Sequence, residues 1–165
     1  MIFEELVKDN RAAFLDEVKN ISKRLKIDPN NLMFAMWFET ARTFSPSIVN
    51  KVSGATGLIQ FMPSTARSLG TTTEKLAKMT NVEQLDYVYR YLAPYAGKMN
   101  DWLDTYLAIF YPALMGKPDS TAIKREIVAK QNPLFDINKD LIIHKYEIRT
   151  ALRNTMPEAA KKVLK

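Results

Sequence analysis

The sequence predicts a mostly α-helical protein. Three observations support this: apolar residues recur at helical spacing near the N-terminus, capping residues and prolines stand where helices would begin, and few segments alternate polar and apolar side chains. The chain of 165 residues is long enough to bury one sizeable core, and 47% of its residues are hydrophobic. We therefore expect a single helical domain spanning residues 1–165.

The first predicted helix is long and amphipathic. Its apolar positions are Phe3, Leu6, Val7, Phe14, Val18, Ile21 and Leu25. Asp28 and Pro29 then mark a second start, because aspartate caps a first turn and proline suits the first helical position. This second helix is expected to reach about Ala41. Residues 32–38 are apolar on every face, so it should lie at the centre of the core.

After the second helix, a loop and several further helices are expected. Residues 43–56 are rich in Ser, Asn, Thr, Pro and Gly, which is typical of a loop or a short irregular hairpin. Helices resume after Pro63, and Thr80 with Glu83 forms a capping box ahead of another. Later helices are expected at residues 102–111, from 119 to about 130, and after His144.

Composition narrows the range of functions. The chain has 24 Lys and Arg against 18 Asp and Glu, and this net charge of +6 favours polyanionic surroundings such as bacterial wall polymer. The basic residues accompany no nucleic-acid recognition motif, so nucleic-acid binding is not expected. No apolar run is long enough to insert into a membrane, and residues 1–10 do not read as a signal peptide. The absence of cysteine excludes disulfides and thiol chemistry.

One acidic residue stands out because of its neighbours. Glu39 ends the apolar run of the second helix and shares a helical face with Leu32, Ala35 and Met36. Apolar surroundings destabilise a charged carboxylate, so the pKa of Glu39 is expected to rise toward the working pH. A carboxyl that keeps its proton can act as a general acid toward a glycosidic oxygen. The competing interpretation is a glutamate at a helix end that points to water or pairs with Arg42.

A second motif follows Glu39. Residues 53–66 read Ser-Gly-Ala-Thr-Gly-Leu-Ile-Gln-Phe-Met-Pro-Ser-Thr-Ala. With Glu39 and Thr40, this stretch resembles the lytic transglycosylases of the lysozyme-like superfamily, in which a Glu-Ser pair precedes Gly-Ala-x-Gly-Leu-x-Gln-x-Met-Pro-x-Thr-Ala. The match is nearly complete over residues 54–66, and the resemblance covers about residues 30–115.

The resemblance implies a fold and a set of site residues. The fold is the lysozyme-like helical domain of soluble lytic transglycosylases, with Glu39 as the catalytic acid and base. A third family motif, Ala-Tyr-Asn-Ala-Gly, is matched in part at residues 109–113, where Tyr111 is kept and Pro112 replaces the asparagine. Thr40 replaces the usual serine and keeps a hydroxyl. The implied substrate-binding residues are Thr40, Ser53, Gly57, Gln60, Phe61 and Tyr111.

The resemblance also implies a reaction on peptidoglycan. Lytic transglycosylases cleave the β-1,4 bond between N-acetylmuramic acid and N-acetylglucosamine with one carboxyl and no required cofactor, and they leave a 1,6-anhydro ring. Paired-carboxylate glycosidases need a second acid, and the sequence offers no obvious one near the motif. The alternative on the same fold is a goose-type lysozyme reaction, with water held by Asp86, Asp101 or Asp104.

Residues 136–147 resemble the calcium loop of an EF-hand. Side-chain oxygens stand at loop positions 1, 3, 5 and 12, and position 7 would add a carbonyl; these residues are Asp136, Asn138, Asp140, Glu147 and Ile142. Leu141 replaces the glycine of the sharp turn, and a left-handed residue with a side chain costs roughly 1–2 kcal/mol. The sequence therefore predicts either a degenerate loop with a structural calcium ion or a plain polar turn before the last helix.

Two rival interpretations come from other functional classes. One is a wall-binding or virion structural module without turnover, for which Pro112 is the main argument. The other is a calcium-responsive interaction domain built around residues 119–165. The preferred interpretation remains an enzyme, expected as a monomer, that acts on peptidoglycan in the bacterial cell wall. The segments at residues 44–73 and 85–88 resemble phage-associated family members, which implies an endolysin, a virion-associated enzyme or another delivery system.

Overall fold

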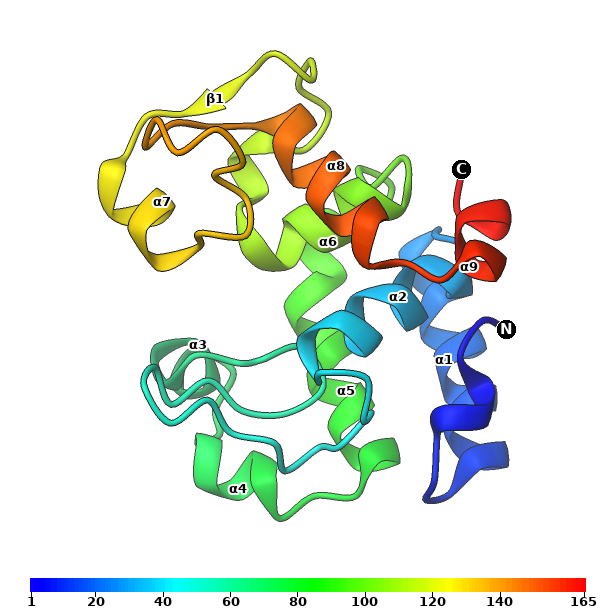
Figure 1. Cartoon of the computed structure of the whole chain (residues 1–165). Coiled ribbons are helices and arrows are strands. Elements are labelled where there is room, and N and C mark those ends of the chain that lie inside the picture. Colours follow the sequence, from blue (N-terminus) through cyan, green and yellow to red (C-terminus); the bar gives the residue numbers. More distant parts are fainter.

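The computed structural model describes residues 1–165 and is mostly helical, as the sequence predicts (Figure 1). Its nine helices agree with a lysozyme-like helical fold. They are α1 (Arg11–Leu25), α2 (Pro29–Glu39), α3 (Pro63–Ser68), α4 (Thr73–Ala77), α5 (Asn81–Leu92), α6 (Trp102–Phe110), α7 (Glu126–Gln131), α8 (Lys145–Thr155) and α9 (Glu158–Val163). Strands β1 (Ala122–Ile123) and β2 (Ile143–His144) pair antiparallel, and short 3-10 helices lie at Glu4–Leu6, Ala93–Tyr95 and Pro112–Leu114.

Helix α2 lies at the centre of the core. It packs against both α1 and α6, and α1 also packs against α5. Residues 32–37 of α2 are all buried, which agrees with the predicted central position. A cluster of 37 buried hydrophobic residues extends from Phe3 to Leu164 and so joins the two ends of the chain. None of the helices combines the length and the hydropathy that crossing a membrane requires.

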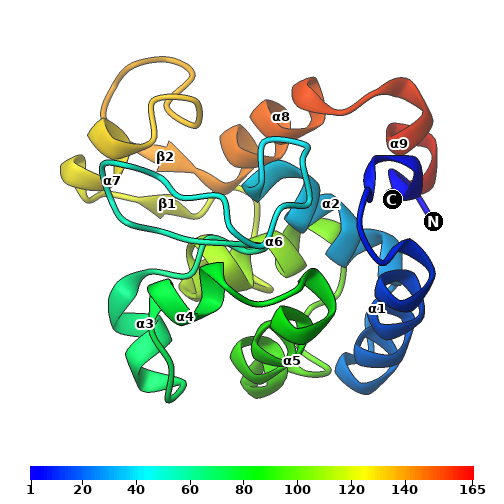
Figure 2. The ribbon, with the colours of Figure 1, turned by 90° about the horizontal axis from the view of Figure 1, so that it is seen from below.

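The remaining elements lie on two sides of α2 and α6. Figure 1 shows the loop after α2 together with α3 and α4 on one side, and α7 with the strands on the other. Both views place α9 beside the N-terminal turn (Figures 1 and 2), and residues of the two segments line a common surface pocket. The site described below lies between the two sides.

The predicted N-terminal helix is wrong as a continuous element. A 3-10 turn at Glu4–Leu6 precedes α1, and Asn10 has a left-handed backbone with φ 50°. The ring of Phe3 stacks on that of Trp37 with the centroids 4.6 Å apart, and Val7 is fully buried. The chain therefore bends before α1, and Phe3 and Val7 are buried on this bent segment. The sequence had predicted that one straight helix from Phe3 to Leu25 would bury these residues along a single face.

The predicted helix from residue 119 to about 130 begins later than expected. Residues 122–123 form β1, whose Ile123 pairs with Ile143, and α7 starts only at Glu126. Asp119 does not cap a helix, because its carboxylate accepts hydrogen bonds from the Arg149 guanidinium at 3.0 and 3.1 Å. Helices α4 and α9 were not predicted, whereas the capping box of Thr80 and Glu83 is confirmed.

The loop after α2 is held by one buried polar side chain. Gln84 of α5 is fully buried, and its Oε1 accepts a hydrogen bond from the Leu58 amide at 2.7 Å. Its Nε2 donates to the carbonyls of Pro46 and Leu76 at 2.8 and 2.9 Å. Gly57 leaves room for this anchor, because a Cβ there would lie 2.3 Å from Gln84 Oε1.

Replacement of Gln84 by leucine is expected to lower the free energy of unfolding by roughly 3 kcal/mol, because two buried backbone groups and one partly buried group lose their partner. Urea unfolding followed by circular dichroism measures the change. Gln131→Leu is the matched control, since that side chain is exposed and makes no hydrogen bond within the protein. Equal midpoints for the two variants would contradict the anchoring role.

Candidate active site

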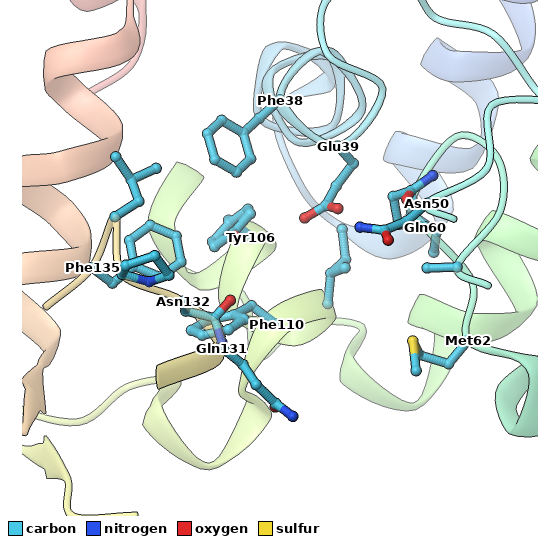
Figure 3. Close-up of a pocket in the computed structure, with 15 residues that line it drawn as sticks. Phe38, Glu39, Asn50, Gln60, Met62, Tyr106, Phe110, Gln131, Asn132 and Phe135 are labelled. Atoms are coloured by element: carbon cyan, nitrogen blue, oxygen red, sulfur yellow. The ribbon is translucent and has the colours of Figure 1, made fainter. Parts of the chain in front are cut away.

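A cleft of about 480 Å³ lies between the loop after α2 and the segment after α7 (Figure 3). Loop residues between 50 and 62 form one wall, and residues 131–135 form the other. Apolar residues of α2 and α6 form the base, and Glu39 at the end of α2 faces the space between the walls. The cleft thus joins segments that are far apart in the sequence.

Glu39 is the only charged residue that lines the cleft. Its carboxyl makes no hydrogen bond or salt bridge within the protein, and Arg42 instead lies over the Trp37 ring, 5.2 Å from its centroid. Burial raises the pKa of Glu39 from 4.5 to about 8. The direction agrees with the expectation from the apolar helix, and the predicted alternative pairing with Arg42 is wrong. The cleft can therefore hold a protonated carboxyl near neutral pH.

Aromatic rings form the floor beside Glu39. The Tyr106 ring packs edge to face against the Phe38 ring, with the ring centroids 5.5 Å apart. The ring centroids of Phe110 and Phe135 lie 5.0 Å apart. Burial, and to a lesser extent the nearby charge of Glu39, raises the pKa of Tyr106 well above its ordinary value. Its hydroxyl, for which the structure gives no protein partner, therefore stays protonated and available to a ligand.

Tyr91 is the second tyrosine near Glu39. Burial first, and then the charges of Tyr95 and Glu39, raise the pKa of Tyr91 to about 12. Its hydroxyl donates to the carbonyl of Ala108 at 2.9 Å, so it supports α6. This hydroxyl is satisfied inside the protein, whereas that of Tyr106 is not.

Two carboxamides stand on the loop wall beside Glu39. Gln60 has a left-handed backbone with φ 56°, and its Nε2 donates to the carbonyls of Gly57 and Ile48 at 3.1 and 3.3 Å. Asn50 Oδ1 accepts from the amides of Val52 and Ser53 at 2.9 and 3.2 Å. Figure 3 shows both side chains next to Glu39.

The structure brings two of the predicted site residues together. Glu39 and Gln60 line the cleft, whereas Thr40, Ser53, Gly57, Phe61 and Tyr111 do not. Tyr111 follows the last residue of α6, and Tyr106, earlier in the same helix, lies at the cleft instead. Of these two tyrosines, only Tyr106 lines the cleft.

Several residues of the matched motif support the site without lining it. Thr40 is fully buried; its hydroxyl donates to the Met36 carbonyl at 2.7 Å and accepts from the Phe44 amide at 2.9 Å. Phe61 is buried, and its ring lies edge to face with that of Tyr91. Ser53 accepts from the Ala55 amide within the loop. These contacts fix the end of α2 and the shape of the loop.

The opposite wall of the cleft could not be predicted from the sequence. Asn132 and Phe135 line the cleft, and both come from the segment after α7. No local motif marks them, because their place depends on β1 pairing with β2 and on aromatic packing against α6. Tyr106 was not predicted either, because the matched motif at residues 109–113 contains only the later tyrosine.

The alternative second acids lie outside the cleft. Asp86 pairs with Arg90 on the surface, with a 2.7 Å distance between Oδ2 and the guanidinium. Asp101 caps α6 by accepting from the Asp104 amide at 2.7 Å. Asp104 is buried, and its carboxylate lies 3.4 Å from Lys145 Nζ. The cleft therefore contains a single carboxyl.

The loop at residues 136–147 turns as the EF-hand resemblance requires. Leu141 takes φ 66°, the left-handed conformation that glycine normally supplies there. Asp136 accepts from the amides of Asp140 and Leu141 at 3.1 and 3.2 Å, and Asp140 accepts from that of Ile142 at 2.9 Å. Glu147 accepts from the His144 amide at the start of α8.

These contacts pair carboxylate oxygens of Asp136, Asp140 and Glu147 with nearby backbone amides. No three His, Cys, Asp or Glu side chains in the molecule are placed so that they could hold a metal ion. The backbone turn therefore fits a calcium loop, and calcium binding stays a prediction.

Comparison with known proteins identifies the family. Neither the curated proteins nor the solved structures gave a significant match. The family model described as "Transglycosylase SLT domain" matches residues 16–110, which include α2, Glu39 and the whole loop wall of the cleft. Since this match covers more than half of the chain, the protein belongs to the SLT transglycosylase family, whose members cleave peptidoglycan.

Proposed function

We propose that the protein is a peptidoglycan lytic transglycosylase in which Glu39 acts first as a general acid and then as a base. The observation that carries this proposal is the isolation of Glu39: it is the only carboxyl in the cleft, it has no partner, and burial raises its pKa to about 8. A proton held near neutral pH is what cleavage of a glycosidic bond requires.

The reaction needs only this one carboxyl. Glu39 donates its proton to the oxygen between N-acetylmuramic acid and N-acetylglucosamine, and the bond from that oxygen to C1 of N-acetylmuramic acid breaks. The 6-hydroxyl oxygen of the same sugar then bonds to C1, while its proton passes to the Glu39 carboxylate. The products are a free 4-hydroxyl and a 1,6-anhydro ring, and Glu39 is protonated again. The absence of a second acid in the cleft favours this route over lysozyme-type hydrolysis.

The whole chain contributes to this function. The cleft needs residues from the loop after α2 and from the segment after α7, so we propose residues 1–165 as one working domain. The net charge of +6 would draw the protein to anionic wall polymers. The resemblance of residues 44–73 and 85–88 to phage-associated family members supports delivery by a phage, for lysis or for entry.

The first test is mass spectrometry of fragments released from purified peptidoglycan. The parent protein is expected to release anhydro-muropeptides, and Glu39→Gln to release them at least about a hundredfold more slowly, because the proton donor is lost. Asp86→Asn is the matched control, since that carboxyl is exposed and lies outside the cleft. Reducing-end products would indicate a lysozyme reaction instead. No release by the parent, with binding intact, would indicate a non-catalytic wall module.

The pH dependence of kcat/KM tests the protonation state. Because the first step needs protonated Glu39, the rate is expected to be flat below a pKa of about 8 and to fall as the pH rises through it. The loss above that pKa should approach about tenfold for each pH unit. Turbidity loss of wall suspensions at low substrate concentration measures the profile. A rate that rises between neutral pH and pH 9 would be incompatible with an acid of this pKa.

Calcium binding by the loop at residues 136–147 is tested by thermal unfolding. We expect calcium to raise the Tm of the parent protein but not that of Asp140→Ala, because an ion bound only by the folded state stabilises it. At a free concentration about a hundredfold above the Kd the gain is about 2.7 kcal/mol. Magnesium is the control ion. The same Tm with calcium and with chelator would show that the loop is a plain polar turn.

A further inference from the structure

A second groove lies where the N-terminal turn at residues 1–6 and α9 meet the end of α2 (Figures 1 and 2). Its volume is about 460 Å³, within the range of roughly 300–1,000 Å³ that is typical of small-molecule sites. All the residues that line it are apolar except Glu5 and Arg42. None of them lines the cleft that contains Glu39, so the groove is a separate candidate site.

Arg42 supplies the only cationic side chain of the groove. This side chain is exposed, makes no ion pair within the protein, and lies over the Trp37 ring, 5.2 Å from its centroid. The Arg42 amide donates to the Trp37 carbonyl at 2.7 Å. Ala41 and Arg42 both have left-handed backbones, with φ 49° and 74°, which is unfavourable for residues that carry a Cβ. A strained turn thus holds an unpaired guanidinium at the groove.

Trp37 provides a second donor without a partner. Its side chain is only 2% exposed, and its indole N–H makes no hydrogen bond within the protein. Buried polar groups are nearly always hydrogen-bonded, so an unpartnered one points to a ligand that can accept from it. Since the Arg42 guanidinium lies over the same indole, an acceptor group bound by Arg42 would also lie close to Trp37. Two donors therefore favour an anionic group at this end of the groove.

The rest of the lining favours an alkyl chain over a peptide. Each residue of a buried peptide brings backbone N–H and C=O groups that need partners, and the apolar lining offers almost none. An alkyl chain needs no such partner. Glu5 is exposed and would repel an anion, so a single anionic head group is expected beside Arg42 and away from Glu5.

We propose that this groove binds a soluble single-chain anionic amphiphile of the fatty-acid class. Its carboxylate accepts hydrogen bonds from Arg42, and its alkyl chain lies on the apolar side chains of the N-terminal turn and α9. The bound ligand would connect both ends of the chain to the turn that follows Glu39. The site is independent of the proposed reaction, because the groove and the cleft share no lining residue.

Calorimetry with decanoate, below the concentration at which it forms micelles, tests the proposal. Decylammonium, which has the same chain and the opposite charge, is expected to bind at least about tenfold more weakly. Dodecanoate should bind about tenfold more tightly than decanoate, because two more methylenes are buried. Arg42→Gln should weaken decanoate binding about tenfold. Glu5→Gln is the matched control in the same groove; it removes the opposite charge and should not weaken binding.

A second variant locates the ligand without touching either charge. Ala159→Trp places a large side chain at an exposed position of α9 that lines the groove, and it should abolish decanoate binding. Ala12→Trp, at an exposed position of α1 outside the groove, should leave binding unchanged. Circular dichroism checks that both variants are folded.

Three results would overturn the proposal. The first is equal binding of decanoate and decylammonium, or no binding of decanoate by the parent protein. The second is decanoate binding that neither Arg42→Gln nor Ala159→Trp changes. The third is binding only to an apolar peptide with a free carboxyl terminus or to anionic phospholipid vesicles, which would indicate a protein partner or a membrane surface instead.

The two proposals of function and amphiphile binding fail separately. Glu39→Gln should bind decanoate as the parent protein does, because Glu39 does not line the groove. A parent protein that releases anhydro-muropeptides and does not bind decanoate would lose only the amphiphile inference. A protein that binds decanoate and releases nothing would lose only the proposed reaction.

Discussion

The site depends above all on burial of the Glu39 carboxyl at the end of a helix that is apolar on every face. Residues 32–37 of α2 are apolar and buried, and Glu39 follows them at the end of the same helix. The consequence is a folded-state pKa of about 8 against 4.5 for an unperturbed glutamate. The stabilisation from holding this proton is fully present below pH 4.5 and is lost as the pH rises through about 8, where the ionised carboxyl is buried unpaired. The surrounding core has to offset this cost.

Support of the site comes from polar groups buried beneath it. The Gln84 side chain makes hydrogen bonds to one backbone amide and two backbone carbonyls around it. Glycine is required at position 57 because a Cβ there would overlap the Gln84 side chain. Thr40 bonds both to α2 and to the start of the loop. Thus Thr40 and Ser53, which the resemblance marks as substrate-binding residues, make hydrogen bonds to the protein backbone. A buried network of this kind fixes geometry because each unsatisfied group would be costly.

The C-terminal third of the chain completes the cleft from the other side. Lys145 at the start of α8 lies 3.4 Å from the buried Asp104 of α6, and its Nζ also donates to the Lys117 carbonyl at 2.9 Å. Removal of either charge would leave the other buried without its counter-charge, so the pair holds α8 against α6. Strand β2 immediately precedes α8 and pairs with β1, which leads into α7. The position of Asn132 therefore follows from contacts between α6 and α8.

The sequence by itself determined the features that depend on neighbours along the chain. Helices α2, α5 and α6 were predictable because their caps and apolar residues are local signals, and the raised pKa of Glu39 followed from the run that precedes it. Only the tertiary structure decided that Tyr106 rather than Tyr111 lies at the cleft, and that Asn132 forms its opposite wall. It likewise replaced the start of one predicted helix by β1. These outcomes depend on contacts between segments that are distant in the sequence. The free energy of such packing exceeds the local helix and strand propensities from which a sequence pattern is interpreted.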